Sequence, residues 1–325
     1  MENTNNLTHE IDGKFFEVIK STRLNEGMVL RSRSGDIFAR LGPKQLVLEE
    51  QIHTLSLYSK GFPVAQVLSS GEMPNDQWYF TETSLGTATF HDLFKEEYKN
   101  DGQVSDVTFG QYLAVIKKYL TAQSMADNKT NVSVTEFVET LLPEERVLSN
   151  YCYFGYDADS YLEAIRVAST KLANCSMGIL QFDLNPFNVL ENGIIDFELV
   201  GYGPIGYDVL MSARWSSAWF TDYPSRCPVA YKLIDNQIAE NDQLVSDITT
   251  KNGITDPTRF IQEFLLLKSA WALSDFNSPQ DTWPKDKIAF SRYRANVLKL
   301  VVETYLADEI IDYRLLSSVT SGELE

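Results

Sequence analysis

Three strongly polar side chains interrupt the otherwise apolar segment 181–198, which reads QFDLNPFNVLENGIIDFE. Asp183 and Asp196 are carboxylates, and Asn188 is an amide five residues after Asp183. Pro186 keeps the stretch after Asp183 out of a regular strand, which leaves that carboxylate free to accept a proton from a substrate hydroxyl. A carboxylate and an amide together suit a hard cation such as Mg²⁺, which takes further ligands from substrate phosphates.

The dipeptide Asn192–Gly193 predicts how the two metal-binding candidates meet. It is the strongest two-residue hairpin signal, because both positions tolerate the positive φ of a type I′ turn. Such a turn would pair Val189 with Asp196, so that Asn188 lies one step diagonal to Asp196. A base, a metal-binding amide and a metal-binding carboxylate in this order are the layout of phosphoryl transfer. The alternative is a surface loop capped by Asp and Asn.

Composition limits the classes of protein that the chain can belong to. The 325 residues, 44% of them hydrophobic, are enough for two lobes with a sizeable core. The formal net charge of −17 repels nucleic-acid phosphates and anionic lipid, so we expect neither as a partner. The same field could attract a cationic small molecule, or it could serve solubility alone.

The cysteines, the histidines and the hydropathy exclude further classes of protein. The three cysteines are odd in number and far apart, which is typical of a reducing compartment and gives no zinc site: Cys152, Cys175 and Cys227. No apolar run is long enough to span a membrane and the start is unlike a signal peptide, so we expect a cytoplasmic protein. The three histidines all lie in the first third of the chain: His9, His53 and His91. A Ser-His-Asp hydrolase or a His-rich metal site would need one of them to fold back onto segment 181–198.

The first 85 residues predict a small sheet with one helix. Residues 27–34 and 36–41 form strand-like runs around Ser34–Gly35–Asp36, which is typical of a hairpin. Apolar residues at helical spacing, among them Leu48, Ile52 and Leu55, predict a helix over 44–60 that Gly61 ends. Residues 63–70 and 77–84 then read as two further strands, which completes the order β-β-α-β-β.

Helical patterns dominate the chain after residue 86. They cover about 108–124, 133–149, 158–175, 228–249, 257–275 and 287–307. The short sequence SLG at 84–86 is the natural boundary and would act as a hinge. We therefore expect an α+β protein with an amino-terminal lobe of residues 1–85 and a larger helical lobe of residues 86–325.

Segment 178–210, GILQFDLNPFNVLENGIIDFELVGYGPIGYDVL, resembles the signature of the aminoglycoside phosphotransferase-like kinases, relatives of choline kinases and protein kinases. The family pattern is His-Gly-Asp-x-x-x-x-Asn, then Ile-Asp-Phe/Trp-Glu, then Gly-x-x-x-Tyr-Asp. DIFARLGP at 36–43 resembles the third strand of the family, and residues 49–68 resemble its following helix and fourth strand. The resemblance covers residues 20–90 and 178–212 and implies a two-lobed protein kinase-like fold.

The resemblance also implies roles for individual residues. Asp183 would be the catalytic base, and Asn188 and Asp196 would hold Mg²⁺. Arg40 would contact the nucleotide phosphates and pair with Glu50.

The resemblance implies a hinge at about 81–88. There the backbone of four residues would meet the adenine of ATP, or the base of GTP: Thr81, Glu82, Thr83 and Ser84. Asp208 would be a buried brace for the catalytic loop.

The implied activity is transfer of a γ-phosphoryl group to a hydroxyl of a small molecule, with an aminoglycoside, an amino-sugar or an amino-alcohol as the leading class. Kinases for choline, homoserine, methylthioribose and fructosamine share the same motif and remain alternatives. A catalytically silent nucleotide-binding module is the rival, because the chain departs from the family pattern. Gln181 and Phe182 replace His-Gly, Phe187 replaces a usual Gly, and the presumed phosphate loop, RLNEGMVL at 23–30, has one glycine.

Weaker candidates lie in the helical lobe. Trp215 with Trp219, and Trp271 with Asp275, are four residues apart and could line a substrate cleft, although a core stripe is the favoured interpretation. Three acidic residues could anchor a cationic substrate or lie on solvated faces: Asp222, Glu263 and Asp275. Nothing in the sequence indicates the oligomeric state.

Overall fold

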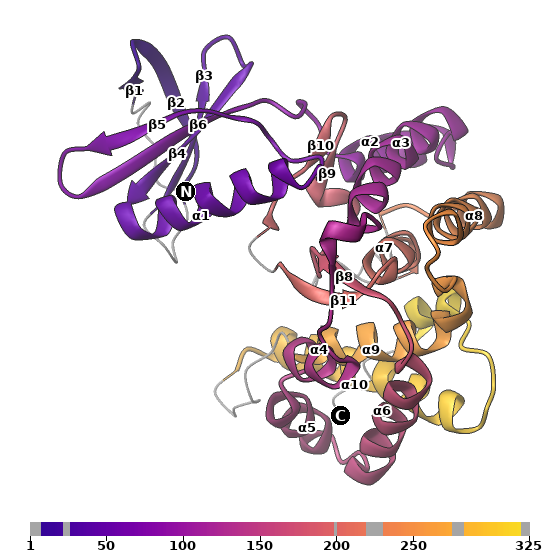
Figure 1. The fold of residues 1–325 in the computed structure, drawn as a ribbon. Helices are drawn as coiled ribbons and strands as arrows, with labels where there is room; N and C mark the ends of the chain where they lie inside the picture. Colours follow the sequence, from indigo (N-terminus) through magenta and orange to yellow (C-terminus); the bar gives the residue numbers. More distant parts are fainter. Residues whose placement is uncertain (1–7, 22–26, 198–199, 219–229, 275–282, 320–325) are drawn as a thin grey trace.

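The chain folds into a sheet-rich lobe and a larger helical lobe, which Figure 1 shows side by side. The computed structural model describes residues 8–21, 27–197, 200–218, 230–274 and 283–319. The expected α+β class is confirmed. Within the described residues, no helix combines the length and the apolar character that crossing a bilayer requires.

The amino-terminal lobe is a six-stranded antiparallel sheet in the order β1-β2-β3-β4-β6-β5. Its elements are β1 (Thr8–Ile11), β2 (Lys14–Ser21), β3 (Met28–Ser32), β4 (Ile37–Pro43), α1 (Lys44–Ser59), β5 (Val67–Met73) and β6 (Gln77–Thr83). The predicted order β-β-α-β-β corresponds to β3 through β6. Strands β1 and β2 were not predicted and extend the sheet beyond β3. The expected phosphate loop falls partly on residues 22–26, which lie outside the described part.

Helix α1 was predicted correctly, and Leu57 of its apolar pattern is buried, but two other residues of that pattern are exposed. Ile52 is 58% exposed and Leu55 is 43% exposed, whereas Gln51 is buried. The reason is a polar contact with the sheet: Trp78 Nε1 donates to Gln51 Oε1 at 2.7 Å, and Gln51 Nε2 donates to Ser70 Oγ at 3.0 Å. A buried amide whose hydrogen bonds are satisfied costs little, so it can replace an apolar residue on the packed face.

The helical lobe contains α2 (Phe90–Asp101), α3 (Asp106–Gln123), α4 (Val134–Leu141), α5 (Glu144–Tyr153), α6 (Ala158–Leu172), α7 (Tyr207–Ala218), α8 (Asp235–Lys251), α9 (Ile261–Ser274) and α10 (Lys285–Leu306). The helix predicted over 133–149 is two helices, because Pro143 separates α4 from α5. Helix α2 was not predicted; it begins after Thr89, whose side chain accepts from the backbone N–H of Asp92. The start of the helix predicted over 228–249 lies partly outside the described residues.

Helix α9 lies within the core of the helical lobe and is buried along almost its whole length. Beside it, three short strands form a sheet in the order β11-β8-β7, from β7 (Lys129–Thr130), β8 (Met177–Leu180) and β11 (Gly201–Pro204). All four residues of β8 are buried. Segment 181–198 follows β8 and therefore starts from a rigid point in the lobe.

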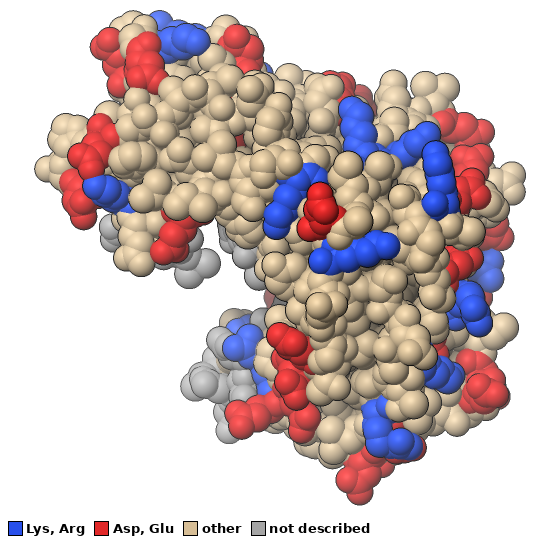
Figure 2. Space-filling model, in the orientation of Figure 1, with Lys and Arg blue, Asp and Glu red and all other residues tan. Residues whose placement is uncertain are grey.

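Figure 2 shows one face of the molecule, which is hollowed between the two lobes. Acidic side chains are spread over both lobes on this face, with basic ones among them. The negative net charge of −17 is therefore not gathered in a single patch on this face.

Candidate active site

Asp183 lies in a tight loop directly after β8. Phe182, the residue before it, adopts a positive φ of 46°, and the Asp183 side chain is 40% exposed. Two amides hold the loop, because Asn185 Nδ2 and Asn188 Nδ2 each donate to the Asp183 carbonyl oxygen at 3.0 Å. The carboxylate of Asp183 is thus presented to solvent on a backbone that its neighbours fix.

The predicted hairpin forms, but with a different turn. Strand β9 (Val189–Leu190) pairs with β10 (Gly193–Ile194) so that Leu190 lies opposite Gly193 and Val189 opposite Ile194. The two-residue turn is therefore 191–192, and the expected pairing of Val189 with Asp196 is wrong.

Gly193 serves close approach to the amino-terminal lobe and not a left-handed turn. A Cβ at this position would lie 2.3 Å from the carbonyl oxygen of Pro63. The next residue, Ile194, donates its N–H to that same oxygen at 2.7 Å, and Asn192 donates its N–H to the Leu85 carbonyl at 2.8 Å. The hairpin is thus tied to the amino-terminal lobe and to the connection between the lobes.

Asn188 and Asp196 are brought together despite the changed turn. Ile195 lies opposite Asn188, because its N–H donates to the Asn188 carbonyl at 2.9 Å. Asp196 is the next residue in the chain. Asn188 is 8% exposed, and Asp196 is exposed with a positive φ of 63°. The neighbouring arrangement that the sequence predicted therefore results from another register.

Gln181 connects the catalytic loop to the hairpin. Its side chain is buried, and Nε2 donates to the Asp196 carbonyl at 2.6 Å. Its backbone N–H is shared between Tyr119 Oη at 3.0 Å and Asp208 Oδ2 at 3.2 Å, and the Tyr119 hydroxyl donates to Asp208. Burial raises the pKa of Asp208 although these hydrogen bonds favour its charged form. Gln181 thus connects the start of the Asp183 loop to the Asp196 backbone through an amide side chain, without a histidine.

Arg40 approaches this site from strand β4 of the other lobe. Its Nε lies 3.5 Å from Glu50 Oε1 on α1 and 3.2 Å from Glu82 Oε1 on β6. Burial alone would lower the pKa of Arg40, but attraction to Glu82, Glu50 and Asp196 raises it. Of these three carboxylates, Asp196 belongs to the helical lobe, whereas Glu50 and Glu82 belong to the same lobe as Arg40.

The segment expected to meet a nucleotide base is a central strand. Thr81, Glu82 and Thr83 belong to β6, which pairs with β4 on one side and β5 on the other. The Thr83 N–H donates to Gln66 at 3.0 Å and the Ser84 N–H donates to Asp36 at 2.9 Å, both to carbonyl oxygens. These two N–H groups already have hydrogen-bond partners. Contact of residues 81–84 with a nucleotide base remains a prediction, and other backbone groups of the segment would have to make it.

Lys268 is a residue of this site that the sequence analysis missed. It comes from α9, is 4% exposed, and donates from Nζ to the Phe182 carbonyl at 3.3 Å. The same Nζ lies 4.0 Å from Asp183 Oδ1 and 3.5 Å from the centroid of the Trp271 ring. The available signal was a single lysine in the apolar sequence FLLLKSAWAL, which a helix can bury only with a partner.

His91 is the second residue that was missed. Its ring stacks on Phe187 of the catalytic loop with a centroid distance of 3.5 Å. His91 is 6% exposed and lies at the start of α2, so one of the three histidines does fold back onto segment 181–198. The same ring lies edge-on to that of Tyr231, with a centroid distance of 5.4 Å, so His91 joins Phe187 to an aromatic group of the helical lobe.

The weaker candidates divide into three groups. Trp215 and Trp271 are half-buried against the main core, as the favoured interpretation expected, and the Lys268 ammonium lies near both rings, 6.0 Å from that of Trp215. Glu263 is 3% exposed, so a solvated face is wrong for it. Trp219, Asp222 and Asp275 lie outside the described residues.

The oxygen atoms at this site fit a hard cation that takes most of its ligands from elsewhere. Donation from Asn188 Nδ2 to the Asp183 carbonyl orients the amide and leaves its Oδ1 available as a ligand atom, and Asp196 adds an exposed carboxylate. Within the described residues, no three His, Cys, Asp or Glu side chains gather in a way that could hold a metal. A set of one amide and one carboxylate is typical of Mg²⁺ bound together with substrate phosphates.

Comparison with known proteins supports the fold. No family model matches the chain, and no curated protein matches it in sequence. Two similar solved structures are thermostable mutants of aminoglycoside phosphotransferase APH(4)-Ia in ternary complexes, one with AMP-PNP and hygromycin B and one with ADP and hygromycin B. Their TM-scores are 0.52 and 0.51, each at 12% identity over 89% of this chain and 93% of that chain. The chain therefore has the kinase-like fold of the aminoglycoside phosphotransferases, as the resemblance implied.

Proposed function

We propose that the protein is a Mg²⁺-dependent phosphotransferase that moves the γ-phosphoryl group of ATP or GTP to a hydroxyl of a small molecule. The observation that carries this proposal is the convergence of Asp183, Asn188 and Asp196 on one braced loop and hairpin, opposite Arg40 of the other lobe. Phosphoryl transfer depends mainly on positioned charge, and this arrangement supplies it.

Asp183 would act as the base. Its exposed carboxylate orients the acceptor hydroxyl and takes its proton as the oxygen bonds to the γ-phosphorus. The bond between that phosphorus and the bridging oxygen breaks, which leaves the phosphorylated acceptor and a nucleoside diphosphate. Arg40 would bind the nucleotide phosphates, and its pairing with Glu50 and Glu82 would hold it in place.

Asn188 and Asp196 would hold Mg²⁺, which would neutralise phosphate charge. Lys268 would keep Asp183 in its orientation from behind the loop, because its ammonium is buried and held by Phe182 and Trp271. Gln181 would fix the Asp196 backbone in the place of the family histidine.

The acceptor that we propose is a cationic amino-sugar or amino-alcohol, with an aminoglycoside as the first choice. The negative net charge and the hygromycin B complexes of the similar structures support this class. The face of Trp271 is taken by Lys268, so other groups would have to bind the acceptor ammonium. Choline, homoserine, methylthioribose and fructosamine remain alternative acceptors.

A coupled ADP-release assay tests the proposal. The panel holds aminoglycosides, amino-sugars, choline and the alternative acceptors, with ATP and GTP tried in turn. The expected result is acceptor-dependent release of nucleoside diphosphate by the wild type and loss of that release in Asp183→Asn. Mg²⁺-dependent nucleotide binding without release for any acceptor would instead support the silent module.

A further inference from the structure

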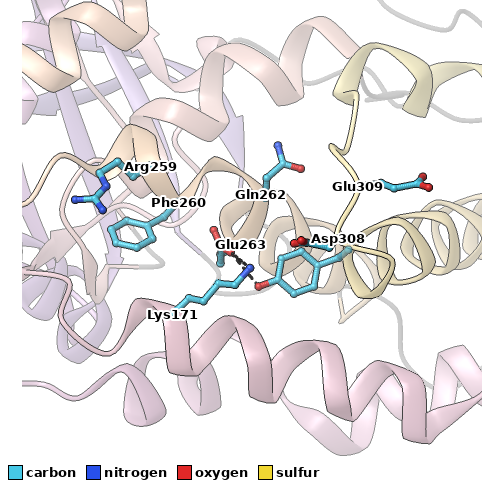
Figure 3. Close-up of a pocket in the computed structure, with 8 residues that line it drawn as sticks. Lys171, Arg259, Phe260, Gln262, Glu263, Asp308 and Glu309 are labelled. Atoms are coloured by element: carbon cyan, nitrogen blue, oxygen red, sulfur yellow. Dashed lines mark hydrogen bonds and ion pairs between the residues drawn. The ribbon is translucent and has the colours of Figure 1, made fainter.

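A second cavity lies in the helical lobe, away from segment 181–198. Its volume is about 370 Å³, and it opens between the last turn of α6, the 3₁₀ turn Pro257–Phe260, the start of α9 and the end of α10 (Figure 3). Its lining residues are Lys171, Arg259, Phe260, Gln262, Glu263, Tyr305, Asp308 and Glu309. This volume is within the range of small-molecule sites.

The deepest charged group of this cavity is the Glu263 carboxylate. Its side chain is 4% exposed, and it accepts a hydrogen bond from the Tyr305 hydroxyl at 2.9 Å. In the described part of the chain, the one cation within ion-pair distance is Lys171, whose Nζ lies 3.2 Å from Glu263 Oε1. A buried carboxylate is costly unless a cation stays beside it.

Lys171 fills the position of a bound ammonium. Its Nζ lies 4.8 Å from the Tyr305 ring centroid as well as beside Glu263, and Figure 3 shows the Lys171 side chain extending toward Glu263. A carboxylate together with the face of an aromatic ring is the usual environment of an organic ammonium. However, the Lys171 side chain is 48% exposed at the end of α6, so it can turn out to solvent without breaking a core contact.

We propose that this cavity is a binding site for a small primary amine, whose ammonium takes the place of the Lys171 ammonium beside Glu263 and Tyr305. Two further carboxylates, Asp308 and Glu309, are exposed at the end of α10 and line the same cavity. A second ammonium on the ligand would meet them. A linear aliphatic diamine is the simplest ligand that carries both ammonium groups.

This site is separate from the candidate active site and does not depend on the proposed function. None of the residues that line the cavity belongs to segment 181–198. Glu263 lies near the start of α9, whereas Lys268, which reaches the Asp183 loop, lies further along the same helix. Binding can therefore be measured without nucleotide or turnover.

Isothermal titration with 1,4-diaminobutane, at a salt concentration near 0.15 M to screen the general surface charge, tests the proposal. We expect measurable binding by the wild type and roughly two- to fivefold tighter binding by Lys171→Ala, because the half-exposed lysine no longer competes for the Glu263 carboxylate. Arg166→Ala is the matched control. It removes the same charge from the same helix, where Arg166 pairs with Glu163 away from the cavity, and should leave affinity unchanged.

Glu263→Gln keeps the shape of the side chain and should weaken binding at least about tenfold, because it removes the charge that the amine pairs with. Equal or weaker binding by Lys171→Ala, or equal tightening by Arg166→Ala, would overturn the proposal. Binding of inorganic phosphate that is lost in Lys171→Ala would assign the cavity to anions and overturn it too. If Glu263→Gln fails to fold, the comparison of Lys171→Ala with Arg166→Ala decides alone.

Discussion

Lys268 Nζ lies 4.0 Å from Asp183 Oδ1, and the two side chains differ sharply in exposure, 5% for the lysine and 40% for the aspartate. The ammonium is therefore buried beside a carboxylate that is much more exposed. Its hydrogen bond to the Phe182 carbonyl joins it to the backbone just before Asp183. We therefore expect Lys268 to act by holding Asp183 and its loop, as a positioning residue.

Replacing Lys268 tests this relationship. Lys268→Met keeps much of the volume and removes the charge, so kcat should fall by about 10- to 100-fold, the equivalent of one charge-assisted hydrogen bond. In an Asp183→Asn background the same change should have little further effect, because the two residues act as one unit. Steady-state kinetics on all four variants measure the coupling. Lys299→Met, at an exposed position of α10, is the control, and equal losses in both backgrounds would assign Lys268 to stability alone.

Asp183→Asn tests the base directly. The amide keeps the size of the side chain but cannot take the acceptor proton, so kcat should fall by about 10²- to 10⁴-fold. Nucleotide affinity should barely change, since the proposed phosphate and metal contacts come from other residues. Turnover and melting temperature are measured together. A stable variant whose turnover stays within about threefold of wild type would contradict the assignment, because that change is far smaller than the loss expected from removing a base.

Asp196→Asn tests the metal site. A neutral amide is a poorer ligand for a hard cation, so the dependence of nucleotide affinity on Mg²⁺ should weaken. Calorimetric titration of nucleotide at several Mg²⁺ concentrations measures this dependence. Glu191→Gln removes an exposed charge from the same hairpin and should leave it unchanged. Identical Mg²⁺ dependence in Asp196→Asn and the wild type would remove Asp196 from the site.

Glu97 predicts a pH dependence of stability. Burial opposes its charge, but hydrogen bonds from Thr108 and from the Ser105 N–H and hydroxyl outweigh it and lower the pKa of Glu97 below 4.5. Its stabilising contribution is therefore present above pH 4.5 and is lost as the pH falls through the folded-state pKa. Glu97→Gln should reduce the free energy of unfolding by roughly 1 kcal/mol at pH 7, and the deficit should shrink below pH 4.5.

Urea unfolding at several pH values measures this difference. Glu96→Gln, on the exposed side of α2, is the control and should show no such trend. A deficit of Glu97→Gln that stays constant down to pH 3 would contradict the prediction.

Local patterns predicted those parts of the site that lie close together in the chain. The order Asp183, Asn188, Asp196 is carried by one short segment, and β-pairing rules place the last two side by side. The turn was wrong because Asn192–Gly193 carries a strong local preference, whereas Gly193 is needed for its approach to Pro63, a residue 130 positions earlier. A contact between residues so far apart in the chain cannot be predicted from a local sequence pattern.

Contacts between distant helices could not be predicted. Lys268 reaches the Asp183 loop from α9, and His91 reaches Phe187 from α2; neither pairing follows from spacing. The buried face of α1 was predicted only in part for a related reason, since Gln51 is buried by hydrogen bonds to the sheet that hydrophobic periodicity does not detect. The fold class was predictable because long periodic segments dominate it.

The ties of the hairpin to Pro63 and to Leu85 restrict how the two lobes can move against each other. Ile194 is bonded to Pro63 in the amino-terminal lobe, and Asn192 is bonded to Leu85 in the connection at 84–86. Any movement of the amino-terminal lobe relative to the helical lobe would therefore have to break the bond to Pro63 or carry the hairpin next to Asn188 and Asp196 with it.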